Sequence, residues 1–150
     1  MCCSGLSHHL YPLSNSFCTG AIGAFGVCLG GDLAYRAALP PAVKATACFY
    51  STDLHSATLG EGKSDDSLIR ATDITGELMM VWGQSDPHVP YAGRRIIRDR
   101  LEDAGVTLEW HEVNAQHAFL RDGAPRFDAA LFLQAMNWTN ALFQRALTRG

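Results

Sequence analysis

The chain has 150 residues, of which 47% are hydrophobic and 18% are charged, and its formal net charge is −3. This balance is typical of one globular domain with its own core. The weak negative charge gives no reason to expect nucleic acid or an anionic membrane as a partner.

The apolar pattern predicts an alternating order of strands and helices that begins near Thr19. We interpret residues 1–18 as a short leader, because they show no periodicity, and residues 19–150 as one partial domain. Predicted strands cover residues 21–27, 43–50, 77–82 and 106–113, and predicted helices cover residues 29–39, 91–104 and about 126–147. This alternation predicts an α/β fold, with a mostly parallel sheet of about four strands flanked by helices.

Helical periodicity and helix-stop signals support the three predicted helices. The first helix ends before Pro40 and Pro41, which cannot continue it. In the last helix an apolar stripe is expected to face the core; it consists of Leu131, Ala135, Trp138 and Leu142. The basic run in the second helix is interpreted as a solvated face; it comprises Arg94, Arg95, Arg98 and Arg100.

The five cysteines point to a reduced protein without a metal site. Their odd number and irregular spacing argue against a disulfide framework. Near the start of the chain, Cys2, Cys3, His8 and His9 lack the spacing with which a short loop wraps a tetrahedral ion. The first basic residue is Arg36, so neither a secretory signal nor a transit peptide fits. No apolar run approaches the roughly 20 residues of a membrane span. We therefore expect a cytoplasmic protein.

The first predicted strand ends in the segment Gly26-Val27-Cys28-Leu29-Gly30. This is the G-x-S-x-G pattern of a nucleophile elbow, with cysteine in place of serine. The two glycines would allow a sharp turn, and the following helix N-terminus would favour a thiolate at Cys28. Taken alone, a cysteine in this position is more often a buried core residue.

Two further residues at strand ends turn the elbow into a candidate catalytic triad. Asp86 follows the third predicted strand and His117 follows the fourth, so nucleophile, acid and base occur in α/β-hydrolase order. His117 would take the thiol proton, Asp86 would orient the imidazole, and the backbone N–H of Leu29 would stabilise an oxyanion. Taken singly, Asp86 is a turn residue and His117 a loop histidine, but the joint pattern favours the triad.

His88 and His55 are rival candidates for the base. His88 directly follows the Asp-Pro turn, where exposure is expected, and His55 lies in the loop after the second strand, a less usual place for a base.

The motifs GAFGVCLGG, VWGQSDPHVP and NAQHAFLRD together resemble the dienelactone hydrolase family of cysteine-dependent α/β-hydrolases. The resemblance runs from about Thr19 to Arg145. It implies Cys28 as nucleophile, Asp86 as acid and His117 as base, with Arg121 holding a substrate carboxylate. It further implies opening of enol-lactones and related activated esters, on an anionic small molecule, without a metal or cofactor.

The chain departs from this family before its nucleophile. The family carries several strands there, whereas only 27 residues precede Cys28. We therefore expect the C-terminal portion of such an enzyme, weakly active because Leu29 supplies a single oxyanion donor. The alternative is an inactive fragment that needs a partner chain to complete its sheet, or that self-associates through an open edge.

Two smaller points concern the thiol. A carboxylate at Asp32, in the first helical turn, would disfavour a thiolate at Cys28. A redox-sensing role ranks last, since the sequence shows no obvious resolving cysteine.

Overall fold

A computed structural model describes residues 20–58 and 64–148 of the chain. The expected leader at residues 1–18 lies outside this part. Within it, the elements are β1 (Ile22–Val27), α1 (Leu29–Ala38), β2 (Val43–Phe49), the short 3-10 helix η1 (Ala71–Asp73), β3 (Glu77–Gly83), α2 (Tyr91–Asp103), β4 (Thr107–Val113) and α3 (Ala129–Leu147). The seven predicted strands and helices are all present, with bounds shifted by up to three residues, whereas η1 has no counterpart in the prediction.

The four described strands form one sheet in which all neighbours are parallel and the spatial order is the chain order. The predicted α/β fold, with a mostly parallel sheet flanked by helices, is therefore confirmed. Because parallel strands end at the same edge of a sheet, the segments that follow β1, β3 and β4 share that edge.

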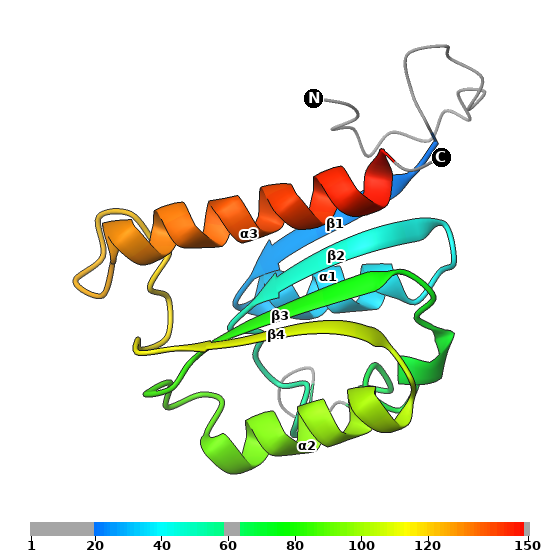
Figure 1. Cartoon of the computed structure of the whole chain (residues 1–150). Helices are drawn as coiled ribbons and strands as arrows, with labels where there is room; N and C mark the ends of the chain where they lie inside the picture. Colours follow the sequence, from blue (N-terminus) through cyan, green and yellow to red (C-terminus); the bar gives the residue numbers. More distant parts are fainter. Residues whose placement is uncertain (1–19, 59–63, 149–150) are drawn as a thin grey trace.

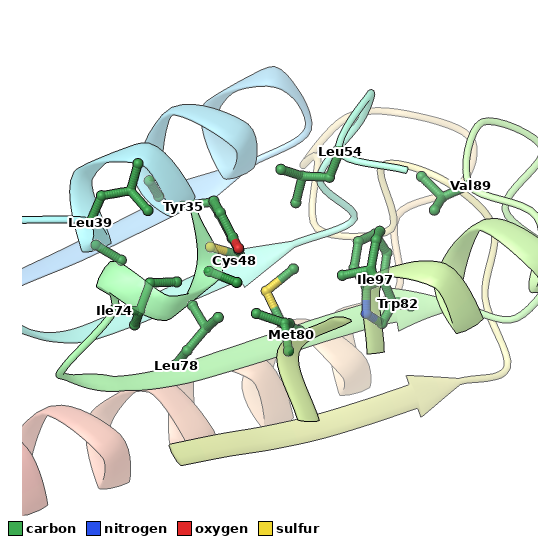
Figure 2. Packing of buried hydrophobic residues seen from close by; sticks show 14 residues of the cluster. Tyr35, Leu39, Cys48, Leu54, Ile74, Leu78, Met80, Trp82, Val89 and Ile97 are labelled. Carbon is green, nitrogen blue, oxygen red and sulfur yellow. The ribbon is translucent and has the colours of Figure 1, made fainter. Parts of the chain in front are cut away.

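The helices cover both faces of the sheet, with α3 on one face and α1 and α2 on the other (Figure 1). Such a sheet needs apolar side chains on both faces, and β2 and β3 are accordingly buried over most of their length. Between the sheet and α1 and α2, Tyr35, Cys48 and Met80 lie in one apolar cluster (Figure 2).

A second cluster lies under α3, where Ala135 and Leu142 pack against the other face of β2 and β3. The remaining members of the predicted stripe, Leu131 and Trp138, are partly buried against the same cluster, so the predicted orientation of α3 is confirmed. The helix begins at Ala129 rather than near Arg126, because Asp128 caps it by accepting a hydrogen bond from the N–H of Leu131.

β1 is the exposed strand of the sheet. Among the described residues it pairs only with β2, and Ile22, Phe25 and Val27 are large apolar residues left exposed along it. Self-association through this edge stays a prediction.

The interpretation of the basic run as a solvated face is wrong for Arg94. Its side chain is buried, with the guanidinium donating to the carbonyl of Val89 and pairing with Glu112 at 3.2 Å. Arg95 and Arg98 are exposed and pair with acidic residues one turn along α2, as a solvated face predicts. None of the helices in residues 20–58 and 64–148 is long and apolar enough to cross a membrane.

Candidate active site

Cys28 lies in a strained turn between β1 and α1. Its backbone has φ 56° and ψ −126°, a left-handed conformation that is costly for a residue with a side chain. The strain is held in place because the N–H of Cys28 donates to the carbonyl of Phe49 at 3.0 Å, and its carbonyl accepts from the N–H of Gly31. This strained strand-to-helix turn is the geometry expected of a nucleophile elbow.

The glycines around Cys28 have different reasons to be glycine. A side chain on Gly26 would clash with the backbone of Gly30, and one on Gly31 would clash with Ser51. A side chain on Gly30 would meet no neighbouring atom. The expectation that two glycines permit the turn is therefore correct for Gly26 and wrong for Gly30. The backbone of Gly30 lies close to Gly26, but a side chain on Gly30 itself would be accommodated.

Backbone hydrogen bonds bring together the two loops that carry Asp86 and His117. The N–H of Ser85 donates to the carbonyl of Ala115 at 3.0 Å, just beyond the ends of β3 and β4. A Cβ on Gly83 would lie 2.5 Å from that same carbonyl oxygen, so the close approach requires glycine there.

Cys28, His117 and Asp86 form an unbroken line of polar contacts. Nε2 of His117 lies 3.2 Å from Sγ of Cys28, and Nδ1 lies 2.7 Å from Oδ2 of Asp86. His117 and Asp86 are buried, while Cys28 is partly exposed. The structure thus brings together the three side chains that the sequence singled out.

The environment of Asp86 sets the tautomer of His117. Burial opposes the charged carboxylate, but hydrogen bonds from His117 and from the backbone N–H of His88 outweigh it and hold the pKa of Asp86 below its ordinary value. An ionised carboxylate can only accept hydrogen bonds, so Nδ1 of His117 carries the donated proton. Nε2 then faces the sulfur of Cys28, with which it can share a proton.

Two aromatic rings hold the imidazole of His117 edge-on. The ring of Tyr50 lies 4.9 Å from it and that of His88 lies 4.6 Å from it, between centroids. His88 is exposed, as expected, and it contacts His117 instead of replacing it. Tyr50 did not emerge from the sequence, although its position directly after β2 is a strand-end signal of the kind that identified the other site residues. Burial raises the pKa of Tyr50 to about 12, so it stays neutral beside the thiol.

The expected roles of Leu29 and Arg121 stay predictions, but the structure shows where both residues lie. Leu29 is the first residue of α1, where a backbone N–H has no carbonyl partner inside the helix. Arg121 is exposed and borders a pocket of about 450 Å³ that also reaches Cys28 and His117. Among the described residues, no carboxylate pairs with its guanidinium.

Asp32 lies behind the elbow and is almost completely buried. Neither of its carboxylate oxygens has a hydrogen-bond partner among the described residues, and Oγ of the nearby Ser51 also lacks one. Burial, reinforced by the charges of Asp65 and Asp53, raises the pKa of Asp32 to about 7. The expected penalty on a thiolate at Cys28 is therefore present only when Asp32 ionises.

His55 lies elsewhere, packed against the backbone of Gly93 at the start of α2. No contact joins it to Cys28 or to Asp86, whereas His117 contacts both. In the described part of the chain, no group of three or more His, Cys, Asp or Glu side chains could hold a metal ion.

The chain is similar in sequence to known hydrolases over most of its length. A profile of the Dienelactone hydrolase family matches residues 7–147. The chain is 42% identical over 132 residues to the "Putative carboxymethylenebutenolidase" of Saccharomyces cerevisiae. This alignment covers 84% of this chain and 48% of the yeast protein. It is 28% identical over 118 residues to the carboxymethylenebutenolidase of a Pseudomonas species, covering 78% of this chain and 44% of that protein. The chain thus spans about half the length of these relatives.

Solved structures share the fold. The structure described as "Putative Dienelactone Hydrolase from Klebsiella pneumoniae subsp. pneumoniae" superposes with a TM-score of 0.71 at 23% identity. The match covers 81% of this chain and 50% of that one, so about half of the solved chain has a counterpart here.

Proposed function

Because this chain belongs to the dienelactone hydrolase family, we propose that it hydrolyses activated esters or enol-lactones through a thioester on Cys28. In this proposal His117 is the general base and then the general acid. Asp86 orients the imidazole and stabilises its charged form. Apart from the substrate and one water, the proposed steps use groups of the chain itself.

One observation carries the proposal: the thiol, the imidazole and the carboxylate touch in sequence, at 3.2 Å and 2.7 Å. Both distances allow direct proton transfer or hydrogen bonding without rearrangement. The alternative of an inactive fragment that needs a partner chain is not favoured, because the described strands already hold these three side chains in contact.

The acylation step follows from this arrangement. Nε2 of His117 takes the proton of Cys28, and the thiolate sulfur forms a bond to the carbonyl carbon of the ester. The carbonyl electrons move to its oxygen, which the N–H of Leu29 stabilises. When the tetrahedral intermediate collapses, the bond from carbon to the leaving oxygen breaks, and that oxygen receives the proton held on His117.

The deacylation step reverses these roles with water. His117 takes a proton from water while the water oxygen attacks the thioester carbon. The carbon–sulfur bond then breaks, the acid product leaves, and the proton on His117 returns to Cys28. The cycle consumes one water and restores every protein group to its starting state.

Arg121 supports an anionic substrate. Its guanidinium borders the pocket next to Cys28 and has no ion pair in the described part of the chain, so a substrate carboxylate could take that place. Small anionic esters or lactones are therefore the proposed substrates.

The proposal is tested by comparing two cysteine variants in the hydrolysis of a p-nitrophenyl ester. Cys28→Ala should lower kcat/KM by at least about 1,000-fold, because it removes the nucleophile. Cys48→Ala is the matched control: Cys48 is completely buried, and burial raises its pKa above its ordinary value, so its thiol takes no part. Unchanged hydrolysis by Cys28→Ala would contradict the proposal.

A further inference from the structure

The pocket beside Cys28 is walled mainly by apolar side chains from β1, from the segment after His117 and from α3. We call it the apolar pocket; its apolar wall consists of Phe25, Val27, Leu120, Phe132 and Met136. Its volume of about 450 Å³ lies in the range of small-molecule sites. On α3, Phe132 and Met136 are four residues apart, so both project from one side of the helix.

Several of these side chains are exposed although they are large and apolar. The exposed fractions are 45% for Phe25, 36% for Val27 and 40% for Phe132. Apolar surface gathered around a reactive group commonly marks a binding site, because covering it with a ligand is favourable. Here the surface reaches the thiol itself, since Cys28 is part of the same wall.

We infer that the apolar pocket binds the acyl chain of the substrate, and that the preferred esters carry a hydrocarbon acyl group longer than acetyl. This inference rests on the proposed function. During acylation the leaving oxygen must lie at Nε2 of His117 to be protonated, while the acyl carbon is bonded to Cys28. The acyl group can then extend along β1 and α3, between Phe25 and Phe132. Phe132 and Met136 thereby set the chain length that the site accepts.

Hydrolysis of p-nitrophenyl acetate, butanoate and hexanoate tests this inference with a constant leaving group. After correction for the hydroxide-catalysed rate of each ester, kcat/KM should rise about two- to fourfold for each added methylene. An equal corrected kcat/KM for the three esters, or one that falls with acyl length, would overturn the inference.

Substitutions on α3 test which side chains cause the dependence of kcat/KM on acyl length. Phe132→Ala and Met136→Ala should flatten the dependence of kcat/KM on acyl length, and Phe132→Leu should restore much of it. Leu133→Ala is the matched control, because Leu133 is 63% exposed, adjacent to Phe132 and outside the pocket wall. A length dependence unchanged in both alanine variants would overturn the inference.

A second measurement does not depend on hydrolysis. N-methyl, N-butyl and N-hexylmaleimide alkylate Cys28 directly, and peptide mass spectrometry gives the rate at this residue relative to glutathione. The relative rate should rise with chain length and lose that rise in Phe132→Ala. If no ester is hydrolysed but the alkylation rate rises with maleimide chain length, the proposed function fails and the apolar pocket is retained as a hydrocarbon-binding site. If the alkylation rate does not rise with chain length, the pocket assignment fails.

The competing explanation is that the exposed surface joins two copies of the chain. Sedimentation of the chain and of Phe132→Ala at the assay concentration separates the two. A monomer with a chain-length preference supports the inference, and a dimer that Phe132→Ala dissociates, without such a preference, overturns it.

Discussion

β1 and β3 both pair with β2 in parallel, yet their side chains meet different surroundings. Every residue of β3 from Leu78 to Gly83 is buried, whereas β1 leaves Ile22, Phe25 and Val27 exposed. The strand that leads to the thiol is therefore the exposed one, and the strand that leads to Asp86 lies inside the sheet.

The helices on these two sides differ in the same way. On α2, the buried guanidinium of Arg94 is paired with Glu112 and donates to two backbone carbonyls. On α1, the buried carboxylate of Asp32 has no hydrogen-bond partner among the described residues. Cys28, which directly precedes α1, has a left-handed backbone, so the strained turn and the unpartnered carboxylate lie on the same side of the sheet.

This contrast suggests how the site is divided. The buried strand β3 leads to Asp86, and the partly buried strand β4 leads to His117. The β1–α1 side carries the strained backbone of Cys28 and the exposed apolar side chains of β1. The predictions below test whether the two sides differ in energy as they differ in structure.

The largest expected contrast is between a substitution on β3 and a substitution on β1. Met80→Ala on β3 should lower the free energy of unfolding by about 3 kcal/mol, because it leaves a cavity at a completely buried position. Phe25→Ala on β1 should lower the free energy of unfolding by about 1 kcal/mol, because Phe25 is already 45% exposed. Urea denaturation followed by tryptophan fluorescence measures both, and equal losses would contradict the contrast.

The second prediction concerns the pH dependence of Asp32. Its pKa rises from an ordinary 3.8 to about 7 on folding, so the folded state retains a proton that the unfolded chain loses. The stability of the protein should therefore fall as the pH rises from about 4 to about 7. Asp32→Asn removes that loss, and it should stabilise the protein by about 2 kcal/mol at pH 8 and by much less at pH 4.5.

A matched control for Asp32 lies on α2. Asp99 is an exposed carboxylate 3.9 Å from Arg95, and Asp99→Asn should change stability by less than about 0.5 kcal/mol at either pH. A pH-independent effect of Asp32→Asn would show that the carboxylate finds a partner or water in solution.

The smallest expected effect is at the rim of the site. Arg121→Ala should lower kcat/KM about five- to tenfold for an ester that carries a carboxylate, and by less than about twofold for its neutral analogue. Arg126→Ala is the control, because Arg126 is also exposed but lies outside the pocket beside Cys28. Equal effects of Arg121→Ala on both esters would remove the proposed carboxylate contact.

The sequence was sufficient to predict the order of the strands and helices and the meeting of Cys28, Asp86 and His117. Both follow from local patterns, since strand ends in a parallel sheet share an edge. The contacts of Tyr50 and His88 with His117 were not predictable, because they depend on ring positions in space. The burial of Arg94 was also missed: its helical spacing matches that of the exposed Arg98, and Arg94 differs by donating to the carbonyls of Gly83 and Val89.

Glycine positions show the same limit. The pattern around Cys28 correctly drew attention to Gly26, but it gave no way to see that the side chain of Gly31 would clash with Ser51 while that of Gly30 would not. The burial of Asp32 without a hydrogen-bond partner among the described residues likewise depends on the loop after β2. That loop has no hydrophobic periodicity from which its position could be predicted.

Rapid acid quenching of the chain with p-nitrophenyl hexanoate, followed by peptide mass spectrometry, tests most directly whether Cys28 forms the acyl-enzyme. We predict a hexanoyl group on the peptide that contains Cys28, released by neutral hydroxylamine as a thioester is. An acyl group confined to another residue, or full hydrolysis by Cys28→Ala without any adduct, would contradict the account.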